Sequence, residues 1–308
     1  MKKKIIALLL LLVCILSVTA CSETQSGTSF TPSSSFMVTF IDVGQGDAAL
    51  VECDNEYMLI DVGTNTRSSS EKIRDLLLDK GIDELKYLVI SHWHEDHYGG
   101  LRQKPDALQN ITEIEYLLCN KDPYEEKKIA DILPVISETK AEITVPNVKD
   151  SYNLGSATIE VIDVSAEGDN DSLVLLITYG KTSFLFTGDI EKETQKRVAD
   201  ALREKSKILE KGENLIKMPH HGAYNSDLAL PPDASDNYLA TLVRESCAKY
   251  FVISVGENNS YDHPHENTLE IINEALETKK LDADSHFFRT DTDGDLVFTS
   301  NGKKITPQ

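Results

Sequence analysis

Seven of the chain's eight histidines fall in three short clusters, and this distribution constrains the fold more than any other feature. The first cluster is the run Ser-His-Trp-His-Glu-Asp-His at 91–97, the second is His220-His221, and the third is His263-Pro-His265. Neutral imidazole is the commonest metal ligand near physiological pH, and an aspartate lies inside the first run. We therefore predict a fold that brings these clusters together around metal.

The first 21 residues have the layout of a lipoprotein signal peptide. Three lysines precede an apolar stretch at 5–18, which is too short for a comfortable membrane-spanning helix. Val-Thr-Ala-Cys at 18–21 is similar to the bacterial lipobox, whose cysteine is lipidated; an ordinary secretory signal is the alternative. We predict an exported protein, anchored through Cys21 at the outer face of the cytoplasmic membrane, with a Ser- and Thr-rich flexible tether at 22–35.

Charge and cysteine content bound the possible functions. The net charge of −20 repels polyanions at long range, which argues against tight, general binding of nucleic acid. If Cys21 is lipidated, three cysteines remain without a CxxC motif, which argues against a disulfide framework. Cys53 and Cys119 lie in apolar, strand-like runs, so we predict that both are buried.

Residues 36–308 show the pattern of one domain in which strands and helices are mixed. Alternating or β-branched runs predict strands at 36–42, 47–53, 56–61, 85–90, 111–119, 157–164, 172–179, 182–187, 215–218, 250–255, 286–289 and 295–299. Helical spacing predicts helices at 71–80, 125–132, 191–211, 238–245 and 266–276. Asp54-Asn55 predicts a hairpin turn. We expect an α/β (α+β) fold in which two sheets face each other with helices outside.

The spacing His92-x-His94-x-Asp96-His97 suits a pair of metal ions. Alternate residues could point into one cavity, while Asp96 and His97 turn to a second side. Two metals about 3.5–4 Å apart are a known hydrolytic device. The alternative is a polar surface loop that happens to hold three histidines.

These residues resemble the metallo-β-lactamase superfamily, whose HxHxDH signature matches residues 92–97. Ile-Asp-x-Gly at 60–63, Thr-Gly-Asp at 187–189 and Pro-His-His-Gly at 219–222 follow in the superfamily's order. The resemblance implies a metallo-β-lactamase αββα sandwich.

Three further motifs are similar to those of the metallo-hydrolase domain of ComEC-type DNA-internalisation competence proteins. They are Phe-Ile-Asp-Val-Gly-Gln-Gly-Asp at 40–47, Asp-Ser-Leu-Val at 171–174, and Ser-Val-Gly at 254–256 before the third histidine cluster. In those proteins the domain follows a membrane channel. Here the resemblance covers residues 36–300 and includes nothing membrane-spanning.

The resemblance also implies roles for individual residues. The implied metal ligands are His92, His94, Asp96, His97, the bridging Asp189, and one of His220 and His221. The superfamily's third histidine for the first metal is missing, and Asp169, Asn170, Asp171 or water could fill its place beside Ser172. Two divalent ions are expected, zinc or manganese, with oxygen ligands favouring manganese or magnesium. Asp96, His263 and His265 are the expected catalytic residues, and Asp42, Asp47 and Asp61 the expected carboxylates behind the ligands.

The function implied is that of an exported, lipid-anchored phosphodiesterase or nuclease of the competence-protein type, with a metal-bridging hydroxide as nucleophile. One alternative is a hydrolase of cell-wall phosphodiesters, similar to the choline-phosphate esterases of this fold. A second is a non-catalytic, metal-binding accessory protein of the envelope. A β-lactamase is disfavoured because the third histidine is absent. No protein partner can be inferred.

Overall fold

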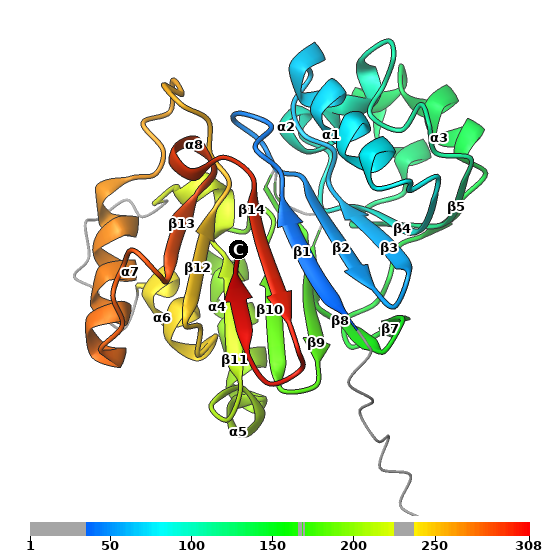
Figure 1. Ribbon diagram of the computed structural model, residues 1–308. Coiled ribbons are helices and arrows are strands. Elements are labelled where there is room, and N and C mark those ends of the chain that lie inside the picture. Colours follow the sequence, from blue (N-terminus) through cyan, green and yellow to red (C-terminus); the bar gives the residue numbers. More distant parts are fainter. Residues whose placement is uncertain (1–34, 166–167, 169, 225–236) are drawn as a thin grey trace, which may run out of the picture. The chain divides into compact units, whose positions relative to one another are not determined.

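The computed structural model describes residues 35–308, with the exception of 166–167, 169 and 225–236 (Figure 1). The predicted signal peptide, Cys21 and all of the tether except Ser35 lie outside the described residues. Pro32–Gln308 delimits one compact unit. Within its described part, no helix combines the length and apolarity needed to cross a membrane.

The first sheet is built mainly from strands of the N-terminal half of the chain. Its strands are β1 (Phe36–Phe40), β2 (Ala49–Cys53), β3 (Glu56–Ile60), β4 (Glu84–Ile90), β5 (Glu113–Cys119), β6 (Glu142–Thr144), β14 (Leu296–Ser300) and β15 (Ile305–Pro307), in the order β15-β14-β1-β2-β3-β4-β5-β6. Asp54 and Asn55 join β2 to β3 with φ of 52° and 65°. Positive φ at both positions is the backbone of a type I′ turn, which confirms the predicted hairpin.

The second sheet holds the strands of the C-terminal half. They are β7 (Ser151–Leu154), β8 (Ala157–Val164), β9 (Leu173–Tyr179), β10 (Thr182–Phe186), β11 (Glu213–Lys217), β12 (Tyr250–Ile253) and β13 (Phe287–Arg289), in the order β13-β12-β11-β10-β9-β8-β7. Strands β10 to β13 run parallel, so their carboxyl ends share one edge of the sheet.

Strand β9 shows why the sheets form a sandwich. Leu175 and Ile177 belong to the core between the sheets, while Val174 and Leu176 belong to a second core under the helices. A strand with both faces covered is apolar at nearly every position. Across the inter-sheet core, the rings of Phe36 and Tyr179 stack with centroids 5.2 Å apart.

Helices cover the outer face of each sheet, which confirms the αββα sandwich (Figure 1). The α-helices are α1 (Arg67–Asp79), α2 (Glu95–Tyr98), α3 (Leu133–Thr139), α4 (Lys192–Glu204), α5 (Ser206–Leu209), α6 (Tyr238–Glu245), α7 (Glu266–Lys279) and α8 (Thr290–Asp293). The 3-10 helices are η1 (Gly99–Arg102), η2 (Pro123–Glu125), η3 (Lys127–Ile129) and η4 (Pro219–Gly222). Cys53 and Cys119 are buried, as predicted.

Two helix predictions are wrong in their extent. Residues 125–132 form short 3-10 turns, and α3 begins only afterwards with Pro134 in its first turn. Proline is tolerated there because the first N–H groups of a helix have no intrahelical partner, so this proline starts a helix instead of ending one. The helix expected at 191–211 is broken at Lys205, where α4 ends.

Candidate metal centre

The first histidine cluster lies where β4 ends. His92 and His94 follow the strand directly, and Asp96 and His97 lie in the short helix α2. His92 and His97 are buried, whereas His94 and Asp96 are half-buried and face the rim of the site. Gly46 of the β1–β2 loop packs so closely on α2 that an added Cβ would lie 2.5 Å from the carbonyl oxygen of Asp96.

His97 is held by Asp61, the carboxylate that follows β3. Its Nδ1 lies 2.8 Å from Asp61 Oδ2. Asp61 also accepts the backbone N–H of Ser91 at 2.7 Å and its hydroxyl at 2.8 Å. With Nδ1 donating to a carboxylate, the lone pair of Nε2 points away from Asp61. This is the arrangement by which proteins orient a ligating imidazole.

Asp189 lies at the centre of the site, in the turn that follows β10. Gly188 has φ of 53°, and an added Cβ there would lie 2.5 Å from the Ser172 side chain. The Ser172 hydroxyl accepts the Asp189 N–H at 3.0 Å. Asp189 Oδ2 lies 3.2 Å from His97 Nε2 and 3.5 Å from His221 Nε2. The carboxylate therefore faces imidazoles from both sheets.

The structure distinguishes the adjacent histidines of η4. His221 Nδ1 lies 2.9 Å from the carbonyl oxygen of Ser254, so Nε2 faces Asp96 Oδ2 at 3.1 Å. His220 turns the other way: its Nδ1 lies 3.0 Å from Glu191 and its Nε2 is 3.8 Å from Asp189 Oδ2. His221 is thus buried in the centre, and His220 is half-buried at its edge.

Four of the predicted ligands converge. One ligand atom from each of Asp96, His97, Asp189 and His221 lies within 4.8 Å of all the others. His97 Nε2 and Asp189 Oδ1 are buried without a hydrogen-bond partner. Buried polar atoms are rarely left so, and a bound cation would satisfy both. Imidazole nitrogen with carboxylate oxygen is a donor set that suits zinc or manganese, so these residues fit a metal.

His92 and His94 lie beside this group and are not part of it. Their rings are 4.5 Å apart, and the His92 ring is 4.2 Å from that of His97. His92 Nε2 is buried without a hydrogen-bond partner, like the atoms of the central group. Burial, reinforced by His97, lowers the pKa of His92 well below its ordinary value, which favours the neutral form that binds metal. A second metal ion would take His92 and His94 as ligands.

The segment before β9 has no side chain that replaces the missing third histidine among its described residues. Asp171 Oδ2 accepts from Ser165 and from the N–H of Gly168, and Oδ1 accepts from Thr194 at 2.8 Å. Both its oxygens thus hold the loop together. Asn170 donates to Glu191 at 2.6 Å. Asp169 lies outside the described residues.

The two aspartates of the β1–β2 loop have different surroundings. Asp42 is half-exposed, accepts the N–H of Gly44 at 3.2 Å and lies 3.4 Å from Lys72, so it stabilises the turn. Asp47 is buried, and its Oδ1 lies 3.4 Å from His221 Nδ1. Only Asp47 is therefore placed to act on a ligand.

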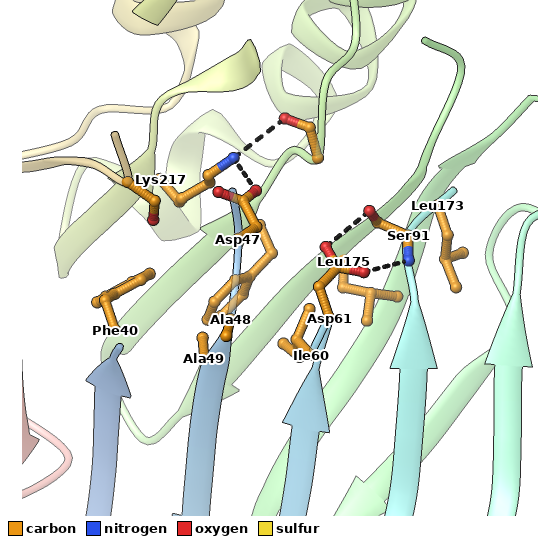
Figure 2. A pocket seen from close by; sticks show the side chains of 13 residues that line it. Phe40, Asp47, Ala48, Ala49, Ile60, Asp61, Ser91, Leu173, Leu175 and Lys217 are labelled. Atoms are coloured by element: carbon orange, nitrogen blue, oxygen red, sulfur yellow. Dashed lines mark hydrogen bonds and ion pairs between the residues drawn. The ribbon is translucent and has the colours of Figure 1, made fainter. Parts of the chain in front are cut away.

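Lys217 is a buried residue of the site that the sequence analysis missed. Leu215 faces the core between the sheets and Ile216 faces the helices, so alternation turns Lys217 towards the opposite sheet. Its ammonium forms an ion pair with Asp47 (Figure 2). It also lies 3.9 Å from Asp189 Oδ1. The sequence feature that could have revealed Lys217 is its position two residues after Leu215, on the face of the strand that points to the core between the sheets.

A cavity of about 10 Å³ lies beside this ion pair, between the sheets (Figure 2). Its polar lining residues are Asp47, Asp61, Ser91, Lys217 and Ser254. This volume holds about one water molecule, so it offers no room for a substrate. Solvent reaches the site at the half-buried His94, Asp96 and His220.

The third histidine cluster lies in the loop before α7. The His263 ring is 5.6 Å from that of His220 and 6.4 Å from that of His221. Burial, followed by the charges of His220 and His221, lowers the pKa of His263 to about 4. His265 is engaged by backbone on both sides, since its Nδ1 accepts the Tyr224 N–H at 2.9 Å and Nε2 lies 3.3 Å from the Tyr261 carbonyl.

Charges within the central group stabilise one another. Burial alone would raise the pKa of Asp189, but His97 and His221 outweigh it and hold that pKa well below its ordinary value. Burial alone would lower the pKa of His221, but Asp189 and Asp47 raise it to about 10. The imidazoles and carboxylates of the central group thus favour each other's charged forms, and metal would compete with protons for the imidazoles.

Comparison with known proteins gives a family match. Residues 41–250 match the family model of the metallo-beta-lactamase superfamily. The chain is 27% identical over 255 residues to ComE operon protein 3 of Bacillus subtilis (strain 168), covering 76% of this chain and 30% of that protein. It is 28% identical over 239 residues to Recombination protein 2 of Haemophilus influenzae, covering 76% and 26%. The chain thus spans less than a third of the length of these relatives.

Two solved structures share the fold at low sequence identity. The metallo-beta-lactamase fold protein YhfI from Bacillus subtilis superposes with a TM-score of 0.52 at 11% identity, covering 86% of this chain and all of that one. CmlA, a diiron beta-hydroxylase from Streptomyces venezuelae, superposes with a TM-score of 0.51 at 15% identity, covering 88% and 54%. At such identities the likeness shows the fold alone.

Proposed function

Because the chain belongs to the metallo-beta-lactamase superfamily, we propose that it is a metal-dependent hydrolase of phosphodiesters, with nucleic acid as its first substrate class. The observation that carries the proposal is the convergence of Asp96, His97, Asp189 and His221, in which the buried His97 Nε2 and Asp189 Oδ1 make no hydrogen bond. The name of one relative, Recombination protein 2, refers to recombination, which is a reaction of nucleic acid, and this supports nucleic acid as the substrate.

Divalent ions held by these residues would lower the pKa of an attacking water and neutralise the charge that develops on phosphate oxygens. The protein's own part is to fix the ligands. Asp61 and the Ser254 carbonyl hold His97 and His221 with Nε2 towards the centre. Asp189 presents one oxygen to imidazoles from both sheets. His263, at the rim, can donate a hydrogen bond to a phosphate oxygen.

The place of action follows from the first 21 residues. We propose that the protein is exported and held through lipidated Cys21 at the outer face of the cytoplasmic membrane. There it would meet nucleic acid or cell-wall polymers as substrates.

A second candidate substrate is a choline-phosphate ester of a cell-wall polymer. The net charge of −20 favours it, because an acidic surface attracts a quaternary ammonium group and repels a bare polyanion. A non-catalytic accessory role is the remaining alternative, and the full set of converging ligands argues against it.

The test is turnover by the purified full chain, stripped with EDTA and reloaded with Zn²⁺ or Mn²⁺. The substrates are bis-p-nitrophenyl phosphate, single-stranded DNA, a p-nitrophenyl phosphocholine ester and a β-lactam. We expect cleavage of the first two, dependent on metal and lost in Asp189→Ala. Exclusive cleavage of the phosphocholine ester would favour the second candidate. No turnover by a metal-loaded, folded protein would refute the hydrolase.

A further inference from the structure

The loop between β12 and α7, whose course Figure 1 shows, carries Tyr261 and His263. Tyr261 is 63% exposed. Its ring stacks on that of His263, with centroids 5.6 Å and planes 24° apart. A single exposed aromatic residue is ordinary on a protein surface, so the position and rigidity of this one decide what it can do.

The backbone on both sides of Tyr261 is fixed by one side chain. Asn259 accepts the N–H groups of Tyr261 at 3.1 Å and of His263 at 3.0 Å. Its amide nitrogen donates to the carbonyls of Gly256 at 3.1 Å and of His263 at 2.7 Å. A ring held this way loses little freedom when a ligand stacks on it, which favours binding.

The loop is also packed against the opposite sheet. Gln45, in the β1–β2 loop, accepts the N–H of Gly256 at 3.1 Å, and its amide nitrogen lies 3.4 Å from His263 Nδ1. An added Cβ on Gly256 would lie 2.5 Å from the backbone nitrogen of Gln45. The loop therefore has a fixed position relative to the residues of both sheets that form the centre.

Three rings lead from the buried ligands to the surface. His221 belongs to the central group, His263 lies beyond it with its ring tilted 29° from that of His221, and Tyr261 covers His263. A substrate whose phosphate lies over the central group would bring its neighbouring group against this outer ring.

We propose that Tyr261 is a stacking platform for a nucleobase next to the scissile phosphate, and that the ligand is single-stranded nucleic acid. This inference rests on the proposed function and deepens it. Only an unpaired base can leave its own stack to lie on a protein ring. Stacking also tolerates any base, and in a chain of net charge −20 it supplies affinity that surface lysines and arginines do not.

The test is equilibrium binding of a fluorescein-labelled single-stranded oligonucleotide to the full chain in EDTA, measured by anisotropy. Because no turnover is needed, the result does not depend on the hydrolase activity. We expect Tyr261→Ala to weaken binding about 5- to 150-fold, the range for loss of one base–aromatic stack. Tyr261→Phe keeps the ring and should bind within about twofold of the parent.

The matched control is Tyr124→Ala, which removes a comparable ring, 59% exposed, from η2. It should bind like the parent, and both variants should unfold at the parent's temperature because the removed rings are exposed. Equal weakening in Tyr124→Ala would overturn the platform, since the effect would not be specific to this loop. So would unchanged binding in Tyr261→Ala, or the absence of any binding by the parent.

Two further outcomes separate this inference from the proposed function. If no phosphodiester is cleaved but Tyr261→Ala still weakens oligonucleotide binding, the hydrolase fails and the platform stands. If Tyr261→Ala weakens binding of a phosphocholine-bearing polymer and leaves oligonucleotide binding unchanged, the ring recognises a quaternary ammonium group, and the nucleobase assignment is wrong.

Discussion

Replacing Lys217 with methionine removes a buried positive charge that Asp47 requires. The lysine is 3% exposed and the aspartate 6%, so neither charge is compensated by solvent. Removing one partner of a buried ion pair costs about 3–5 kcal/mol when the other charge stays buried alone. His221 Nδ1 lies 3.4 Å from Asp47 Oδ1, so we expect a loss near the lower limit. Natural domains are stable by about 5–15 kcal/mol, so Lys217→Met should lose a large fraction of its free energy of unfolding and still fold.

The double variant Lys217→Met/Asp47→Asn removes both charges and keeps side chains of similar size. It should recover most of the loss, because neutral groups in place of a buried pair are often tolerated. The assay is urea unfolding of the parent, both single variants and the double variant at pH 7 in EDTA, so that metal does not contribute. The double-mutant cycle then isolates the coupling between the two residues. A loss below about 1 kcal/mol in Lys217→Met, or losses that simply add, would refute this reasoning.

The same pair gives a pH dependence with a definite sign. Burial alone would raise the pKa of Asp47, but Lys217 and then His221 lower it to about 2. A carboxyl group whose folded pKa is below its unfolded value stabilises the fold above the unfolded pKa, about 3.9, and loses that contribution as pH falls towards the folded pKa. The free energy of unfolding of the parent, measured relative to that of the double variant, should therefore be constant above about pH 5 and fall between about pH 4 and pH 2.

Three further predictions concern ligands, rim and anchor. Asp189→Ala should lower the metal content measured by elemental analysis and abolish turnover. His263→Ala should keep its metal and lose at most about 10²–10⁴-fold in rate. The reverse pattern would show that His263 is the ligand and that Asp189 is not. His221→Ala should lose metal and His220→Ala should retain more of it, which calorimetric titration of the metal-free proteins would measure; equal losses would contradict the division between them. Cys21→Ser should move the protein from the membrane to the soluble fraction, and unchanged fractionation would rule out lipidation.

Much of the fold could be predicted because its signals are local. The apolar run of β9 and the Asp54-Asn55 turn depend on neighbours in sequence, and both hold in the structure. Local spacing misled at 125–132, where apolar spacing resembled a helix but Pro134 opens α3 instead. The spacing of apolar residues does not show at which residue a helix begins when that residue is determined by the packing of neighbouring segments.

The site was harder to predict from the sequence, because residues far away along the chain determine the orientation and the partners of its side chains. His220 and His221 are adjacent and chemically identical, and the carbonyl of Ser254 determines which of them faces Asp96. Lys217 could have been found from its place on an apolar strand, but its partner lies on the opposite sheet. Asp171 was one of several candidates for the place of the missing histidine, and only the structure shows that Thr194 donates to one of its oxygens.

The pairing of β1 with β14 has a consequence for how the chain acquires this structure. Phe36 lies opposite Ser300 in an antiparallel ladder, so the first sheet is completed only when its last strands arrive. Until then β1 has one open edge, and an open edge invites pairing with other chains. Contacts between such distant segments also slow folding, since the intervening chain must be brought back first. A polypeptide with this connectivity cannot complete its first sheet until its last residues have been synthesised.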